Sequence, residues 1–365
     1  NKKIVNYRRK YCFFIYFLND TIIPERISIL EESRMIKVMD CTLRDGGNVM
    51  GKGFPADLTG GIVKALVEAN VDYIEVGNAG GIGAYEVAGF TKAETDEKYL
   101  EVIQPYVGTG KVGMFLNAKR FRDHYVELGA SKGLSFLDAD EARLAVEPIH
   151  AIKKRGIKAF YSAMKAYLVT PEQLAESAKM LEAEGLDEFT VMDSAGCMLP
   201  EEVARTVEVL KKAVNIPIAF HCHNNLALSA ANALAAYRAG VDILDGGLMG
   251  MARSAGNLPT EAGIALLHRY GEAQHVNLYG LLEYIAEDLE PAMLERYGYH
   301  NAITPFDLVL GITGLHSSKG KVFKQVAKET GVNLYQLMVH VGKIDLKNPS
   351  EELIRSEAVK LKEAR

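Results

Sequence analysis

Two histidines separated by a single residue, His221 and His223, have the spacing to hold a metal ion. They follow the short apolar run 216–220, which has the composition of a β-strand. Side chains alternate along a strand, so both imidazoles would point to the same side and could share one ion. The alternative is that each is an ordinary surface or core histidine bonded to a neighbour. Cys222 would point the other way and pack.

An arginine and an aspartate follow the first apolar run of the chain, in the segment Thr42–Gly47. Asp45 could supply a hard oxygen ligand that completes a set of two histidines and one carboxylate with open positions. Arg44 could neutralise a developing oxyanion. Taken alone, such a pair is more often a solvated ion pair or a turn. Together with the histidine pair, it favours a metal site.

Two further segments carry polar residues where a strand is expected to end. Asp193 follows the run 188–192, and it would either orient a metal-bound histidine or cap the next helix. The glycine-rich segment 246–257 ends in Asn257, whose amide oxygen could reach the ion. Glycine lets the backbone approach a ligand closely, although the same composition also suits an ordinary flexible loop.

Short apolar runs alternate with amphipathic helical stretches from residue 35 onward. The runs span residues 36–41, 73–76, 112–116, 134–137, 157–162, 188–192, 216–220 and 243–248, and helical stretches include 58–70, 141–155, 171–184, 200–214 and 229–239. Eight such units predict an α/β fold, a TIM (β/α)8 barrel, with its active groups at the C-terminal ends of the strands. An open doubly wound sheet is the alternative, but it usually has a glycine-rich phosphate turn after the first strand.

The chain divides into three parts on this interpretation. Residues 35–270 form the metal-binding barrel, and residues 271–365 form a C-terminal helical annex with helices expected at 278–297, 304–314, 319–330 and 333–341. Residues 1–34 contain a basic cluster and an apolar run, 11–18, that is shorter than the ~18 residues of a membrane span. We interpret this leader as non-native or disordered, with Met35 as the natural start.

Composition narrows the class of protein. The 365 residues are 48% hydrophobic and 24% charged, with a net charge of −5, so no basic excess points to nucleic acid or to an anionic membrane. None of the four cysteines forms a C-x-x-C pair, which argues against a zinc ribbon or a disulfide framework. Scattered cysteines suit a reducing cytosol, and we expect a cytoplasmic protein.

Three ordered motifs carry a family resemblance. The segments T-L-R-D-G at 42–46, H-x-H at 221–223 and G-x-x-x-x-A-G-N at 250–257 resemble the DRE-TIM metallolyase (HMGL-like) superfamily. Within it, the D-S-x-G at 193–196 and the H-x-H-x-N-L-x-L at 221–228 are most similar to the 4-hydroxy-2-oxovalerate aldolases. The resemblance covers roughly residues 36–360.

The resemblance implies a metal-dependent retro-aldol reaction. Asp45, His221 and His223 would bind Mn²⁺ or Mg²⁺, with Asn257 close by. Arg44 would stabilise an enolate and Ser194 would contact the substrate, a 4-hydroxy-2-oxo acid that is cleaved to pyruvate and an aldehyde. The resemblance also implies a partner, an acylating aldehyde dehydrogenase that receives the aldehyde, and hence a homo- or hetero-oligomer.

The sequence departs from the aldolase pattern at the acid–base position. Where the aldolases have a histidine two residues after the first D-G, this chain has Asn48, whose amide would border the substrate but cannot act as a base. In the annex stretch 311–318, two tyrosines are absent and His316 is present. One hypothesis is that His316 has taken over the proton transfer; the alternative is a surface histidine.

Two other functions compete with the aldolase interpretation. An acyl-CoA lyase or a Claisen-type acyltransferase would use the same barrel, but those relatives usually carry Glu-Gln or Leu-Gln after the first D-G, and this chain has Gly47-Asn48. A non-catalytic degenerate homologue would bind a metabolite or a protein without turnover. The retained candidate ligands and Arg44 weigh against it.

Overall fold

The computed structural model describes residues 35–86, 93–117, 132–135, 139–300, 304–313, 315, 319–346 and 348–363. Residues 35–365 form one compact unit. The division of this unit into a barrel and an annex at residue 270 stays a prediction. The expected leader, residues 1–34, and His316 both lie outside the described residues.

Parallel strands close into a barrel in the described chain, each paired with its neighbour in sequence order and the last paired with the first. They are β1 (Lys37–Asp40), β2 (Tyr73–Val76), β3 (Val112–Asn117), β4 (Lys132–Ser135), β5 (Phe160–Ala163), β6 (Glu188–Asp193), β7 (Ile218–Cys222) and β8 (Ile243–Gly246). Each of the eight predicted runs overlaps one of these strands, so the predicted TIM barrel is confirmed. All residues that end a strand at its carboxyl side therefore meet at one rim.

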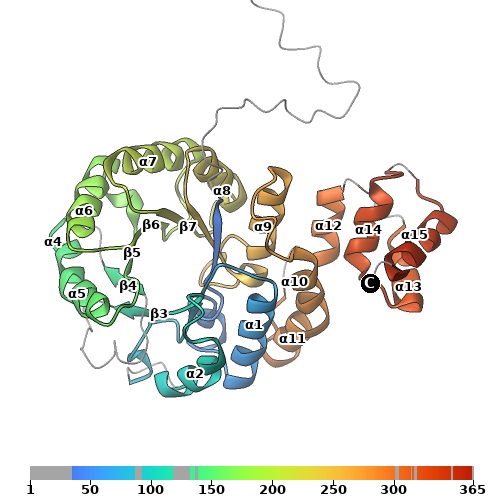
Figure 1. The fold of residues 1–365 in the computed structure, drawn as a ribbon, viewed down its shortest axis with the longest axis horizontal. Helices are drawn as coiled ribbons and strands as arrows, with labels where there is room; N and C mark the ends of the chain where they lie inside the picture. Colours follow the sequence, from blue (N-terminus) through green and yellow to red (C-terminus); the bar gives the residue numbers. More distant parts are fainter. Residues whose placement is uncertain are drawn as a thin grey trace, which may run out of the picture. The chain divides into compact units, whose positions relative to one another are not determined.

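Helices cover the outside of the barrel and continue after it. Those of the barrel are α1 (Ala56–Glu68), α2 (Asp96–Ile103), α4 (Ala139–Ala142), α5 (Val146–Lys154), α6 (Pro171–Ala183), α7 (Pro200–Ala213), α8 (Ser229–Arg238) and α9 (Thr260–Arg269). Those of the annex are α10 (Leu278–Tyr284), α11 (Glu290–Tyr297), α12 (Pro305–Thr313), α13 (Gly320–Thr330), α14 (Leu334–Gly342) and α15 (Glu351–Glu363). Figure 1 shows α4–α8 around the strands. Among the described residues, no helix is both long and apolar enough to cross a membrane.

Two helix starts follow directly from local sequence signals. At α6, Thr170 Oγ1 accepts a hydrogen bond from Gln173 N at 3.2 Å, and Gln173 Oε1 accepts one from Thr170 N at 2.9 Å. At α7, the Glu202 carboxylate accepts from Leu199 N at 2.8 Å. Both helices begin with proline, which has no N–H to leave unpaired in the first turn. The starts predicted at residues 171 and 200 are confirmed.

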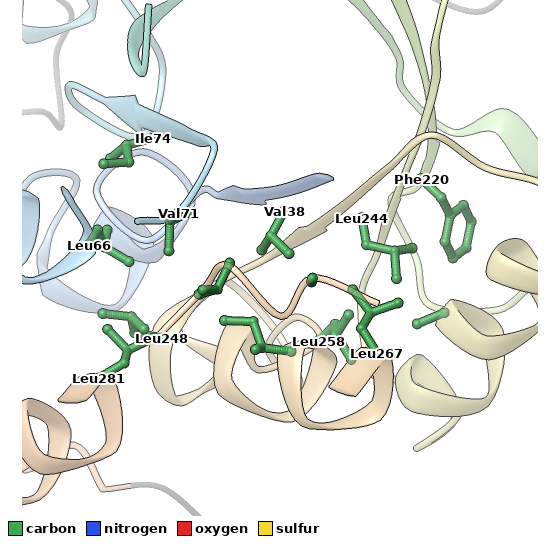
Figure 2. Close-up of a cluster of buried hydrophobic side chains, with 14 of the residues drawn as sticks. Val38, Leu66, Val71, Ile74, Phe220, Leu244, Leu248, Leu258, Leu267 and Leu281 are labelled. Atoms are coloured by element: carbon green, nitrogen blue, oxygen red, sulfur yellow. The ribbon is translucent and has the colours of Figure 1, made fainter. Parts of the chain in front are cut away.

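Apolar side chains close the barrel where β1 meets β8. Val38 of β1 and Leu244 of β8 are buried. Figure 2 shows them in one cluster with Leu258, which lies just before α9, and Leu267, which lies within it. Burying one such side chain completely stabilises a fold by about 1.5–3 kcal/mol. The packing therefore fixes the segment between β8 and α9, which carries Asn257.

A buried aspartate ties the same seam together by hydrogen bonds. Asp40 Oδ2 accepts from Thr260 Oγ1 at 2.6 Å, and Asp40 Oδ1 accepts from Thr42 N at 2.9 Å. Thr42 Oγ1 in turn accepts from Leu248 N at 2.7 Å. Burial raises the pKa of Asp40 to about 6, although these hydrogen bonds oppose the shift. The ends of β1 and β8 and the start of α9 are thus held by one carboxyl group.

The stretch 278–297 was predicted as one helix, and the structure adds a π-helical turn in its middle. The turn, Ile285–Leu289, joins α10 to α11, and Pro291 follows it. Proline cannot donate to the carbonyl four residues earlier, so the wider turn relieves a bond that an α-helix would require. Within the described chain, α10 contacts α1 and α14, and α12 contacts α9, which places the annex against the barrel.

Replacing Asp40 separates the effect of its charge from that of its hydrogen bonds. Its folded pKa is raised from 3.8 to about 6, so its contribution to stability is present below pH 3.8 and is lost as the pH rises through about 6. Asp40→Asn removes the charge and keeps an acceptor, so its free energy of unfolding at pH 8 should equal or exceed that of the wild type. Asp40→Ala leaves two buried donors unpaired and should lose about 2–4 kcal/mol. Urea unfolding at pH 5 and pH 8 measures both, and Asp40→Asn being as unstable as Asp40→Ala at pH 8 would refute this explanation.

Candidate metal centre

The turn after β1 carries Asp45 into the barrel mouth. Arg44 N and Asp45 N both donate to Cys41 O, at 3.1 and 2.8 Å, and a 3₁₀ turn, Gly46–Met50, follows. A Cβ on Gly46 would lie 3.2 Å from both Cβ and O of Met251, so glycine lets this turn approach the loop after β8. Asp45 is only 2% exposed. The carboxylate is therefore presented inside the molecule at the rim.

The two histidines of β7 and its following loop meet Asp45 there. His221 Nε2 lies 3.6 Å and His223 Nε2 lies 3.7 Å from Asp45 Oδ2, and the two imidazole rings are 5.4 Å apart. One ligand atom from each of the three residues lies within 4.8 Å of the others. All three side chains are buried. The side-by-side placement predicted from the H-x-H spacing is what the fold produces.

Several polar atoms in and beside this cluster lack hydrogen-bond partners within the described chain. His221 Nε2, both ring nitrogens of His223 and Asn257 Oδ1 are buried and unpaired. Buried polar atoms without partners are costly, and the separations from Asp45 exceed hydrogen-bond length. Imidazole nitrogens and a carboxylate are the donors that bind divalent transition metals, with Mg²⁺ preferring oxygen. These residues therefore fit one divalent ion held by Asp45, His221 and His223.

The charges of the cluster suit the exchange of a proton for a cation. Burial would raise the pKa of Asp45, but Arg44 and the imidazoles lower it well below its usual range. Burial, with the charge of His221 beside it, lowers the pKa of His223 to about 4. His221 has its pKa raised, because Asp245 and Asp45 outweigh burial. A cation entering between these groups would displace the proton of His221.

His221 is oriented from behind by two residues that the sequence analysis did not single out. Its Nδ1 lies 3.5 Å from Asp245 Oδ2 on β8 and 3.8 Å from Cys41 Sγ. A carboxylate behind a ligating histidine sets its tautomer and ring orientation. The signal available in the sequence was an acidic residue, Asp245, inside an otherwise apolar strand.

Two carboxylates hold the guanidinium of Arg44 in place, and one of its two terminal nitrogens has no hydrogen-bond partner in the described chain. Its Nε donates to Glu75 Oε2 at 2.9 Å, its Nη1 lies 3.2 Å from Asp45 Oδ1, and its guanidinium carbon lies 5.0 Å from the Phe115 ring centroid. The remaining Nη2 is buried without a hydrogen-bond partner in the described chain. Arg44 is thus a fixed cation beside the candidate ligands with one N–H₂ group to offer. Glu75, which fixes it, was missed in the sequence because its partner lies 31 residues away.

Asn48 and Asn257 both hold Asp45 in place. Asn48 Nδ2 donates to Asp45 O at 2.9 Å and to Asp45 Oδ1 at 3.2 Å, while Asn48 Oδ1 accepts from Lys52 Nζ at 2.8 Å. Asn257 Nδ2 donates to Asp45 Oδ2 at 2.9 Å. Here Asn257 orients the carboxylate through its amide nitrogen, whereas the sequence suggested its oxygen as a ligand; that ligand role stays a prediction.

The loop after β6 packs against the backbone of His223, and the carboxylate of Asp193 forms hydrogen bonds within its own loop. Asp193 accepts from Cys197 N at 3.1 Å and from Met198 N at 3.0 Å, so it orders the loop before α7, whose own N-cap is Leu199; the expected helix cap is not what these bonds form. Gly196, at a φ of +58°, lies against the backbone of His223, where a Cβ would come within 2.6 Å of His223 O. Ser194 Oγ accepts from Lys165 N at 2.9 Å. Its expected contact with substrate stays a prediction.

Removing a candidate ligand should abolish tight metal binding. We expect one Mn²⁺ per chain, and an affinity at least ~100-fold lower for Asp45→Asn or His223→Ala, because a three-residue site loses a ligand. Asp245→Asn should lose about 10–100-fold, since it removes the carboxylate behind His221. Isothermal titration calorimetry measures these affinities, with circular dichroism to verify folding. The control is His150→Ala, which changes an exposed histidine on α5; undiminished binding by Asp45→Asn would refute the site.

Comparison with known proteins places this barrel in a family. The sequence model of the HMGL-like family matches residues 35–287. A 4-hydroxy-2-oxovalerate aldolase from Pelotomaculum thermopropionicum is 32% identical over 323 residues, which cover 87% of this chain and 94% of that protein. The oxaloacetate decarboxylase of Mycobacterium tuberculosis is 32% identical over 310 residues, covering 84% and 90%.

A solved structure shares the fold at lower identity. The hydroxymethylglutaryl-CoA lyase of Pseudomonas aeruginosa superposes with a TM-score of 0.61 at 19% identity, over 76% of this chain and 98% of that one. This likeness shows the fold alone, whereas the aldolase relatives match in sequence over nearly their whole length. The chain therefore belongs to the HMGL-like family, and it is a carbon–carbon lyase.

Proposed function

We propose that this chain is a divalent-metal-dependent aldolase that cleaves a 4-hydroxy-2-oxo acid to pyruvate and an aldehyde, with Mn²⁺ or Mg²⁺ as its cofactor. The observation that carries the proposal is the buried set of Asp45, His221 and His223 beside the rigid guanidinium of Arg44. The name of the relative from Pelotomaculum thermopropionicum supports the same activity.

The residues around the cluster account for the main step. Asp45, His221 and His223 would hold the ion, which when bound supplies a Lewis acid for the 2-oxo acid. Arg44 Nη2, buried and unpaired in the described chain, would donate to the enolate oxygen as the C3–C4 bond breaks. Its other nitrogens face Glu75 and Asp45, so the donor does not need to reorganise during the reaction. Ser194 and Asn48 would border the substrate at the same rim.

The proton of the 4-hydroxyl needs a different acceptor from Asn48. An amide nitrogen carries no basic lone pair, and Asn48 is already engaged with Asp45 and Lys52. We propose His316 for this role, as the sequence suggested. Its substitution by alanine should lower aldol cleavage, and unchanged turnover would exclude it.

Decarboxylation of a 2-oxo diacid is a second candidate function, and Asn48 favours it. Loss of CO₂ from oxaloacetate breaks a carbon–carbon bond with no hydroxyl proton to remove, so this reaction does not need the base that Asn48 cannot supply. The same metal ligands and Arg44 would stabilise the same pyruvate enolate. The relative from Mycobacterium tuberculosis is named for that reaction. No comparable observation favours the acyl-CoA lyase, the acyltransferase or the non-catalytic alternative.

Further features of the resemblance stay proposals. They comprise an acylating aldehyde dehydrogenase as a partner that takes up the aldehyde, a homo- or hetero-oligomeric assembly, and a cytoplasmic location. Co-purification of the chain with such a dehydrogenase would test the first two directly.

Pyruvate release should depend on the candidate ligands. We expect metal-reconstituted protein to release pyruvate from at least one 4-hydroxy-2-oxo acid or from oxaloacetate, and Asp45→Asn to reduce kcat/KM by at least ~1,000-fold, as expected for loss of a central electrostatic group. A coupled lactate dehydrogenase assay measures the rate. Full activity after removal of metal by a chelator would refute metal dependence, and no pyruvate from any of these acids would refute the proposed function.

Restoring a histidine at residue 48 distinguishes the two candidate reactions. A general base contributes about 10²–10⁴-fold to a step that needs one, so Asn48→His should raise aldol cleavage relative to oxaloacetate decarboxylation by at least about tenfold. Asn48→Ala controls for the lost hydrogen bonds to Asp45 and should lower both reactions. An equal change of both rates in Asn48→His would mean that residue 48 does not face the 4-hydroxyl.

A further inference from the structure

An exposed arginine lies at the mouth of the candidate site without a partner for its charge. Arg253 belongs to the loop between the 3₁₀ turn Leu248–Gly250 and Asn257. No carboxylate in the described ranges lies within ion-pairing distance of its guanidinium. Arg44, the other arginine of this region, is buried and paired with Glu75 and Asp45. Arg253 is therefore free to meet a ligand.

The loop that carries Arg253 is fastened to the loop that carries His223. Asn224 N donates to Gly256 O at 2.8 Å, and Asn225 Nδ2 donates to Ser254 Oγ at 2.7 Å. Gly256 N donates back to Arg253 O at 3.2 Å. These bonds, at Arg253 and just after it, fix its backbone relative to the loop that carries His223.

The charge of Arg253 acts across the barrel mouth. Burial raises the pKa of Tyr167, in the loop after β5, and Arg253 opposes that rise. Arg253 thus belongs to a loop that is bonded to the loop after β7, and its charge acts on Tyr167 in the loop after β5. A substrate whose 2-oxo acid end lies at Asp45 and the histidines would direct its other end toward this opening.

We propose that Arg253 binds a second carboxylate of the substrate, so that the preferred substrate is a 2-oxo diacid. The inference rests on the proposed function and narrows it to a substrate class. Arginine pairs with a carboxylate through two parallel charge-assisted hydrogen bonds, whereas a methyl end would leave it nothing to bind. Both candidate reactions accept such a substrate.

The aldol step on a diacid balances without a further reactant. In 4-hydroxy-2-oxoglutarate the C3–C4 bond breaks and its electron pair passes into the enolate, which takes a proton at C3 to give pyruvate. The 4-hydroxyl loses its proton as C4 becomes the aldehyde of glyoxylate, whose carboxylate would lie at Arg253. No oxidant or reductant is consumed.

Two unreactive acids with the same carbon skeleton test the proposal. 2-Oxoglutarate and 2-oxovalerate differ only in the second carboxylate, so the ratio of their dissociation constants isolates its contribution. In the Mn²⁺-loaded full chain, calorimetry should give at least about tenfold tighter binding of 2-oxoglutarate, the effect of one charge-assisted pair. Arg253→Gln should reduce this ratio to about two or less, and Arg253→Lys should give an intermediate ratio.

A charge-matched control separates a local contact from the net charge. Lys212→Gln removes one exposed positive charge from α7, outside the mouth, and should leave the ratio unchanged. Equal binding of the two acids by the wild type, or a preference that survives in Arg253→Gln, would overturn the proposal. A ratio that falls equally in Lys212→Gln would overturn it too.

The binding ratio keeps this inference distinct from the proposed function. If 2-oxoglutarate is preferred through Arg253 but neither 4-hydroxy-2-oxoglutarate nor oxaloacetate is cleaved, the diacid subsite stands and the proposed reaction falls. If 4-hydroxy-2-oxovalerate is cleaved at least as well as the diacid and the binding ratio is near one, the reaction stands and the diacid inference falls.

Discussion

The buried negative charge of Asp45 is the constraint on which this site depends. A carboxylate that is 2% exposed is stable only where positive charge and hydrogen-bond donors surround it. Arg44 supplies a permanent charge on one side, and Asn48 and Asn257 supply amide donors on others. On the remaining side are two imidazoles at distances too long for hydrogen bonds. A divalent ion would complete this arrangement, because it would neutralise the carboxylate and bind one nitrogen of each ring.

Much of the surrounding barrel serves to hold that cluster still. Glu75 on β2 fixes Arg44, and Asp245 on β8 stands behind His221, so strands on both sides of β1 contribute. The hydrogen bonds of Asp40 then join the end of β1 to the start of α9 and, through Thr42, to the segment after β8. The closure of the barrel and the geometry of the site are therefore parts of one network. A substitution at the seam would be expected to disturb metal affinity as well as stability.

The parts of the site that generate an enolate differ in character from the parts that select a substrate. The ligands and Arg44 are buried, oriented by several partners each and suited to any reaction that breaks a bond next to a 2-oxo acid. Asn48 and Arg253 lie at the edge of the same rim, where one change of side chain alters what can be deprotonated or bound. This division is compatible with the names of two relatives at 32% identity, one an aldolase and one a decarboxylase.

The sequence by itself determined the barrel, because its strands and helices follow local patterns of apolar residues and its helices begin at local signals such as Thr170-Pro171. It also identified the three candidate ligands, since a period of two places His221 and His223 on one side of a strand. It could not identify Glu75, Asp245 or Lys52, whose roles come only from contacts with residues distant in sequence or across a turn. Nor could it show that Asp193 bonds to the loop before α7, or that the nitrogen of Asn257 faces Asp45. Those contacts depend on which atoms meet when the barrel closes, and only the tertiary structure brings them together.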